Sequence, residues 1–153
     1  MKRLFVALLC LCAWSAHAAP DIQPFVRGSA KQIAAAHPGK PYILAFWSLT
    51  CSHCREELGQ LGELLQKNPG VAVVVVSTDS PAEVGEIAAV LAENRLQGAQ
   101  AWGFADSFVE RLRADVDRKW RGELPRTYLF DAAHQAVAHS GKLRPEQLAA
   151  WLK

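Results

Sequence analysis

The apolar residues of this chain form two kinds of pattern. Continuous apolar runs at residues 42–47 and 71–76 have the length of strands buried on both faces of a sheet. Other segments place apolar residues three or four apart, which is typical of amphipathic helices. Helices of this kind are expected within residues 29–36, 58–65, 84–91, 106–115 and 145–152. A shorter run at residues 99–104 predicts another strand, and residues 127–130 and 136–140 predict a hairpin around residues 131–135.

Turn and capping residues separate these segments. Proline and glycine at residues 37–41 and 68–70 end the first two helices, and Ser80-Pro81-Ala82-Glu83 has the composition of a capped helix start. Residues 19–27 are expected to be an extended lead-in. Strands that alternate with helices indicate an α/β fold with a mainly parallel central sheet, helices on both faces, and a C-terminal β-hairpin and helix.

Several side chains can be assigned to the interior or the surface from these patterns. Phe108 and Leu112 lie four apart and are expected to face the core from one helix. Leu152 is expected to face inward from the last helix. His134 and His139 fall in the predicted hairpin and are expected to be exposed.

The first 18 residues differ in composition from the rest. A basic start of Lys2 and Arg3 precedes an apolar stretch from Leu4 to Trp14, and small residues follow at Ala16 and Ala18. This three-part layout predicts a secretory signal peptide over residues 1–18 and a single domain over residues 19–153. The apolar stretch is shorter than the roughly 20 residues of a membrane span. An uncleaved anchor on the outer face of the inner membrane is the alternative.

Removal of this segment changes the charge and the cysteine count. Loss of two basic residues leaves 15, equal to the 15 acidic residues, so no nucleic-acid-binding surface is indicated. Of the four cysteines only Cys51 and Cys54 remain. A bridge over so short a loop constrains the unfolded chain little. The pair is therefore better explained by redox reactivity or metal binding.

The two cysteines lie between an apolar strand and a leucine-faced helix. Cys51 should start that helix, where free N–H groups and the helix dipole favour a thiolate. Cys54 should lie one turn further along, shielded but close to the first sulfur. The outer thiolate can then attack a partner disulfide, and the inner thiol can resolve the mixed disulfide.

The segment from Ala45 to Leu58 resembles the thioredoxin superfamily, in which an aromatic-rich strand leads into a C-x-x-C helix. The segment from Glu123 to Asp131, which contains Leu124-Pro125, resembles the proline loop of that superfamily. With the signal peptide, the chain is most similar to TlpA-like periplasmic thiol:disulfide oxidoreductases. The resemblance implies a cis bond before Pro125, and it implies that Ser52, His53, Leu124 and Pro125 contact the substrate. It implies no cofactor and no bound metal.

Two side chains near the cysteines have open roles. The resemblance implies that Glu57, on the same helix face as the cysteines, is a partly buried catalytic residue that tunes the cysteine pKa and handles protons. An exposed acid stabilised by the helix dipole is the alternative. His53, as a cation, would stabilise a Cys51 thiolate, whereas an exposed histidine would have little effect.

The chain departs from the family pattern before the first cysteine. Thioredoxin has a buried aspartate where this chain has Ala45, which gives Glu57 more weight as proton acceptor. Thr50 stands where tryptophan is usual. A peroxiredoxin is disfavoured, because Leu44 and Ser48 occupy the positions of that family's proline and threonine.

Three functions remain open at this point. The first is an exported, monomeric reductant of protein disulfides in the periplasm that receives electrons from a membrane-bound donor. The second is a disulfide oxidant or isomerase with the same dithiol. The third is a metal-binding module, for instance a copper chaperone, that uses Cys51, Cys54 and His53, although closed zinc sites need four ligands.

Overall fold

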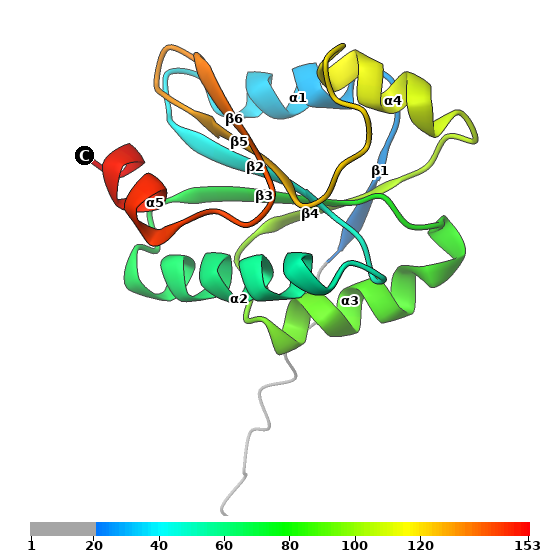
Figure 1. Ribbon diagram of the computed structural model, residues 1–153, viewed down its shortest axis with the longest axis horizontal. Helices are drawn as coiled ribbons and strands as arrows, with labels where there is room; N and C mark the ends of the chain where they lie inside the picture. Colours follow the sequence, from blue (N-terminus) through cyan, green and yellow to red (C-terminus); the bar gives the residue numbers. More distant parts are fainter. Residues whose placement is uncertain (1–20) are drawn as a thin grey trace, which may run out of the picture.

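The computed structural model describes residues 21–153, so the predicted signal peptide lies outside the described residues. A six-stranded sheet has the order β1-β4-β3-β2-β5-β6, with helices on both faces (Figure 1). The elements in chain order are β1 (Ile22–Phe25), α1 (Ser29–Ala36), β2 (Tyr42–Trp47), α2 (Ser52–Lys67), β3 (Ala72–Ser77), the 3-10 turn η1 (Pro81–Glu83), α3 (Val84–Glu93), β4 (Gln100–Phe104), α4 (Val109–Val116), β5 (Arg126–Phe130), β6 (Ala136–Ser140) and α5 (Pro145–Trp151).

The predicted α/β class is confirmed. Strands β1, β4, β3 and β2 are parallel, and β5 and β6 add an antiparallel edge, as the hairpin pattern predicted. Strand β1 was not predicted. In the sequence it looks like a lead-in because only Phe25 of its four residues is buried. The strand forms because it pairs with β4, with Phe25 opposite Phe104, and the local sequence pattern does not reveal this pairing.

The central strand β2 divides the core into two layers. All six of its residues are buried. Ile43, Ala45 and Trp47 belong to the hydrophobic cluster that contains the leucines of α2, whereas Leu44 and Phe46 belong to the cluster on the opposite face. Side chains alternate between faces along a strand, so one continuous apolar run serves both layers. Figure 1 shows α1 and α4 over one face and α2 and α3 over the other.

Some predicted orientations are wrong. Phe108 is 59% exposed, because the Asp106 carboxylate accepts a hydrogen bond from the Phe108 amide at 2.8 Å and α4 begins only at Val109. Leu152 is 42% exposed, because α5 ends before it. His134 is half-buried, since its Nε2 lies 2.8 Å from the His37 carbonyl oxygen. His139 is also half-buried, with its Nδ1 2.8 Å from the Gln147 amide.

The Ser80 cap was predicted correctly. The Ser80 hydroxyl accepts from the Ala82 amide and the Glu83 carboxylate accepts from the Ser80 amide, and the turn begins with Pro81. Within the described residues, no helix is long and apolar enough to cross a membrane.

Candidate active site

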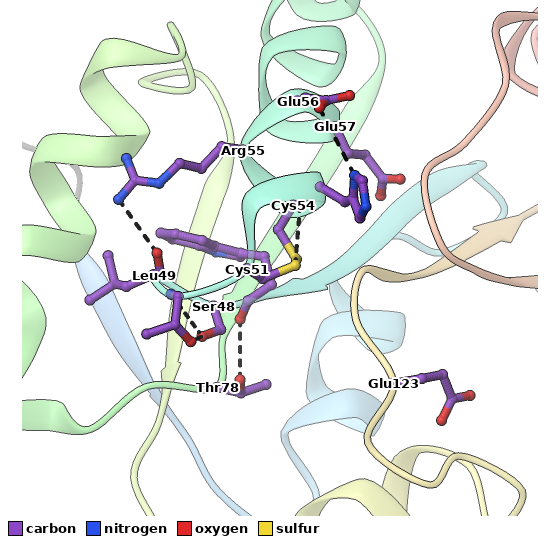
Figure 2. Close-up of a disulfide and its surroundings, with 12 residues drawn as sticks. Ser48, Leu49, Cys51, Cys54, Arg55, Glu56, Glu57, Thr78 and Glu123 are labelled. Atoms are coloured by element: carbon purple, nitrogen blue, oxygen red, sulfur yellow. Dashed lines mark hydrogen bonds and ion pairs between the residues drawn. A yellow bond between two sulfur atoms is a disulfide. The ribbon is translucent and has the colours of Figure 1, made fainter.

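The two cysteines lie at the junction of β2 and α2 and form a disulfide (Figure 2). Cys51 is the N-cap of α2, and its sulfur accepts a hydrogen bond from the Cys54 amide at 3.2 Å. Cys54 is fully buried and Cys51 is half-buried. After reduction, the outer sulfur would face the unpaired N–H groups of the first helical turn, which stabilise a thiolate.

The Cys51 backbone is held by the turn that precedes it. Its amide donates to the Ser48 carbonyl oxygen at 3.1 Å. The Thr78 amide, just after β3, donates to the Trp47 carbonyl oxygen at 2.9 Å. The end of β2 is thus fixed both by the neighbouring strand and by the first residue of the helix cap.

Glu57 is buried on α2, one helical turn after Cys54. Only 2% of its surface is exposed, so the alternative of a solvated acid is wrong. Its Oε1 accepts from the Thr127 hydroxyl, and its Oε2 accepts from the Leu143 amide at 2.7 Å. Burial raises the pKa of this carboxyl, and the two hydrogen bonds lower the pKa and oppose that effect only in part. The group is therefore suited to hold a proton.

The missing aspartate of the thioredoxin pattern is explained by this arrangement. Ala45 on β2 is the register partner of Thr127 on β5, and both are buried. Thr127 directs its hydroxyl to Glu57, which lies one helical turn after Cys54. The carboxylate beneath the cysteines comes from α2, while β2 supplies only a methyl group.

His53 lies at the surface of the same helix. Its side chain is 74% exposed, and its Nδ1 lies 3.9 Å from a Glu56 oxygen. The other Glu56 oxygen lies 2.6 Å from the ammonium of Lys142, and this hydrogen bond and charge lower the Glu56 pKa. Ser52 is also exposed. Both residues between the cysteines are therefore open to a substrate.

The proline loop follows the sequence prediction. The Leu124–Pro125 bond is cis. Leu124 packs against both core clusters, one of which contains Cys54. Figure 2 shows Glu123 of this loop with its carboxylate turned away from the disulfide. Contact between the loop and the cluster that contains Cys54 is therefore made by Leu124.

An ion-pair network beside this loop was not predicted. Arg126, whose side chain is 11% exposed, donates to Asp117 at 2.8 Å, to Ser140 at 2.6 Å and to the Tyr128 hydroxyl at 3.0 Å. Burial raises the pKa of Tyr128 to about 12, so its hydroxyl keeps the proton that it donates to Asp117 at 3.3 Å. An arginine directly after the loop proline was the only signal in the sequence, and its partners Asp117 and Ser140 lie 9 and 14 residues away.

The network also contains the loop itself. Glu123 accepts from the Arg126 guanidinium at 3.4 Å and from the Ser140 hydroxyl at 2.9 Å. The Glu123 carbonyl oxygen accepts from the Trp120 indole at 2.9 Å. These contacts hold the segment before Pro125 against β6 and the core.

The metal-binding alternative requires several ligand side chains at one place. Among residues 21–153, no cluster of three or more His, Cys, Asp or Glu side chains is placed to hold a metal ion.

Solved structures with the same fold include redox proteins. A secreted disulfide oxidoreductase of Mycobacterium tuberculosis, described as homologous to E. coli DsbE, has 21% identity and a TM-score of 0.61, over 77% of this chain and 84% of that chain. The thioredoxin domain of a thiol-disulfide oxidoreductase from Bacteroides vulgatus has 23% identity and a TM-score of 0.59, over 77% and 80%. StoA from Bacillus subtilis has 23% identity and a TM-score of 0.55, over 76% and 84%.

The fold and the Cys51–Cys54 pair define a thiol–disulfide oxidoreductase of the thioredoxin superfamily. Within this class, the chain belongs to the AhpC/TSA family, whose model matches residues 16–140. None of the curated proteins compared with the chain matches it significantly.

Proposed function

We propose that this protein is an exported reductant of protein disulfides. The single observation that best supports exchange with partner disulfides is the arrangement of the two sulfurs: Cys51 caps α2 and is half-exposed, and Cys54 is buried one helical turn before the buried Glu57 carboxyl. The Cys51 sulfur is accessible for attack on a partner disulfide, and the Cys54 sulfur is shielded until the mixed disulfide is resolved.

The exchange needs two successive attacks by thiolates. The Cys51 thiolate attacks one sulfur of the partner disulfide, forms a mixed disulfide and releases the partner's first thiolate. Cys54 then loses its proton and attacks the Cys51 sulfur, which closes the Cys51–Cys54 disulfide and releases the second partner thiolate. Two electrons pass to the partner, whose two thiolates take up protons.

Glu57 is the proposed acceptor of the Cys54 proton. It lies one helical turn after Cys54, and burial raises its pKa, so it can take a proton closer to neutral pH than an exposed glutamate. Its hydrogen bonds to Thr127 and Leu143 fix the orientation of the carboxylate. We assign Cys51, Cys54 and Glu57 to the chemistry.

Substrate contact is proposed for Ser52, His53, Leu124 and Pro125. Ser52 and His53 are exposed beside Cys51, and Leu124 and Pro125 belong to the loop that the Arg126 network holds. An extended peptide next to its disulfide could pair with backbone groups of this loop.

Export to the periplasm is proposed from the composition of residues 1–18 and from the likeness to a secreted oxidoreductase. A reductant in an oxidising compartment needs a continuous supply of electrons. We therefore propose a membrane-bound electron donor, and a monomer that moves between donor and client.

We do not propose a peroxidase function, although the chain belongs to a family named AhpC/TSA. Leu44 and Ser48 stand where a peroxiredoxin is expected to have proline and threonine. Leu44 is buried in the core, and the Ser48 hydroxyl is bonded to Asp79.

The direction of electron flow is tested by the reduction potential of the Cys51–Cys54 couple. A reductant should lie near the thioredoxin value of about −270 mV, and an oxidant near the DsbA value of about −120 mV. A potential near the higher value would contradict the proposed direction and support the oxidant.

The exchange itself is tested by trapping. With Cys54→Ala in the native host, Cys51 should stay covalently attached to its client, and mass spectrometry should identify a protein that carries a disulfide. Cys51→Ala is the matched control and should trap nothing, because Cys54 is buried. If the two variants trap the same proteins or none, the proposed exchange is wrong.

A further inference from the structure

The turn before Cys51 is bound to the end of the neighbouring strand through one carboxylate. Asp79 lies two residues after β3 and accepts from the Ser48 hydroxyl at 2.9 Å and from the Leu49 amide at 2.9 Å. Ser48 and Leu49 are the first two residues after β2 (Figure 2). Asp79 thus holds both a side chain and a backbone group of the segment that leads to Cys51.

The carboxylate is itself fixed. The Ser77 hydroxyl donates to Asp79 Oδ2 at 2.6 Å and accepts from the Asp79 amide at 3.0 Å. Ser77 is fully buried in β3. The orientation of the carboxylate is therefore set by the sheet and not by solvent.

Ser48 connects this carboxylate to the reactive cysteine. The Thr50 amide donates to the Ser48 hydroxyl at 3.3 Å, and the Cys51 amide donates to the Ser48 carbonyl oxygen at 3.1 Å. The chain from Asp79 to the Cys51 backbone is therefore continuous through Ser48.

No cation is paired directly with this carboxylate. Among residues 21–153, none of the ion pairs within 4.0 Å includes Asp79. The basic groups around the turn bond to other partners: Arg55 reaches the Leu49 carbonyl oxygen at 3.5 Å, and His53 and Lys142 both face Glu56. The Asp79 carboxylate is therefore held by hydroxyl and amide donors and not by an ion pair.

The negative charge of Asp79 has a direct consequence for the Cys51–Cys54 redox couple. Reduction of the disulfide can place a thiolate on Cys51, and a negative charge bonded to Ser48 and Leu49 of the same turn disfavours that form. A less stable reduced form makes the protein disulfide easier to form, so the dithiol gives up its electrons more readily.

We propose that Asp79 is a positioning residue that fixes the Cys51 turn and whose negative charge, not ion-paired with any cation, biases the dithiol towards giving electrons. This inference rests on the proposed function, because it concerns the same couple. It assigns the reducing character in part to a residue 28 positions after Cys51, outside the C-x-x-C helix and the proline loop.

The test compares Asp79→Asn with Asp106→Asn. Asp106 is also half-buried and close to the end of a parallel strand, but the bond that its carboxylate accepts comes from Phe108, on its own segment. Each protein is equilibrated with reduced and oxidised dithiothreitol, and the pH midpoint of Cys51 alkylation is measured in the reduced form. Asp79→Asn should lower the equilibrium constant for forming the protein disulfide by about threefold or more and lower the alkylation midpoint. Asp106→Asn should change neither.

A second pair of variants separates charge from attachment. Ser48→Ala keeps the carboxylate but removes one of its bonds, so it should not shift the equilibrium in the oxidising direction. Asp79→Glu keeps the charge and should retain most of the bias of the dithiol towards giving electrons. This variant replaces Asp79→Asn in the comparison if Asp79→Asn does not fold. If Asp79→Asn matches the wild type or Asp106→Asn, or if Ser48→Ala shifts the equilibrium as far as Asp79→Asn, the inference is overturned.

The dithiothreitol equilibration also distinguishes a failure of the Asp79 inference from a failure of the proposed function. If the wild-type dithiol cycles with dithiothreitol and Asp79→Asn behaves identically, only the role of Asp79 is wrong. If the wild-type pair does not cycle at all, the proposed function fails and the inference fails with it.

Discussion

Glu57 of α2 and Thr127 of β5 share a hydrogen bond beneath the disulfide, although they lie 70 residues apart in the sequence. The bond joins the helix that carries both cysteines to the strand that follows the proline loop. Two predicted parts of the site, the C-x-x-C helix and the loop, are therefore connected through a buried acid. This connection makes Glu57 the most informative position to change.

Glu57→Gln should slow the resolving step and leave the first attack nearly unchanged. Glutamine keeps the shape and can still bond to Thr127 and Leu143, but it cannot accept a proton from Cys54. We expect a roughly 10²-fold lower rate of mixed-disulfide resolution at pH 7, typical for loss of a general base. Stopped-flow fluorescence with a peptide disulfide would measure both steps.

The neighbouring Glu56→Gln is the matched control, since Glu56 is exposed and ion-paired with Lys142. It should resolve the mixed disulfide at the wild-type rate. Equal effects of the two substitutions would remove Glu57 from the mechanism.

The stability of the oxidised protein should depend on pH through Glu57. Because burial raises the Glu57 pKa in the folded state, the folded protein holds this proton to a higher pH than the unfolded chain does. The stability that protonated Glu57 contributes is thus fully present below the unfolded pKa of about 4.3 and is lost as the pH rises through the folded pKa.

Urea unfolding of wild type and Glu57→Gln between pH 4 and 8 checks this directly. The difference in unfolding free energy should move in favour of the glutamine variant as the pH rises, by an amount of the order of 1 kcal/mol. A constant difference over this range would show that Glu57 does not titrate abnormally.

Arg126→Ala should loosen the proline loop. The substitution leaves Asp117, Glu123 and Ser140 without their shared donor, which should cost about 1–3 kcal/mol of unfolding free energy. Because the loop would present its backbone less well, we expect KM for a peptide disulfide to rise about three- to tenfold with kcat less affected. Steady-state kinetics and thermal unfolding would measure these effects.

Arg121→Ala provides the comparison, because Arg121 lies on the same loop but is exposed. It should be close to wild type in both assays. A kcat loss in Arg126→Ala with KM unchanged would argue against a role in substrate positioning.

Gly62→Ala should destabilise the protein, whereas Gly59→Ala should not. A Cβ at Gly62 would lie 1.8 Å from the Asn94 carbonyl oxygen, after α3, while a Cβ at Gly59 would meet only the Asn94 side chain at 3.5 Å. We expect a loss of about 1–3 kcal/mol or more at Gly62 and a gain of up to about 1 kcal/mol at Gly59, where alanine favours the helix. Equal unfolding midpoints would show that α2 and this turn can separate at no cost.

The sequence predicted most of the fold because the strongest elements carry local signals. The buried strand β2 and residues 72–76 of β3 are continuous apolar runs, and α2 has its leucines on one face. Strand β1 escaped prediction because its residues become a strand only by pairing with β4, which is 75 residues or more away in the chain. The Gly62 contact is of the same kind, since it depends on how two helices approach each other.

The sequence predicted the reactive residues of the candidate site but not the contacts that hold these residues in place. Cys51, Cys54 and Pro125 are recognisable from spacing and motif, and Glu57 from its helical position relative to the cysteines. The burial of Glu57 was implied only by the family resemblance and not by local pattern, because its partners Thr127 and Leu143 come from distant segments. The roles of Asp79 and Arg126 could not be predicted, because Asp79 also bonds to Ser48 and Arg126 also bonds to Ser140, groups that only the folded sheet brings near.

The central claim is that the start of α2 lowers the proton affinity of the Cys51 sulfur while Cys54 stays shielded. The most direct measurement is the rate of iodoacetamide alkylation of each cysteine in the reduced protein as a function of pH, resolved by peptide mass spectrometry. We predict a Cys51 midpoint clearly below the value of about 8.5 for a free cysteine, with Cys54 largely unmodified. A Cys51 midpoint at or above 8.5, or equal labelling of the two sulfurs, would contradict the account.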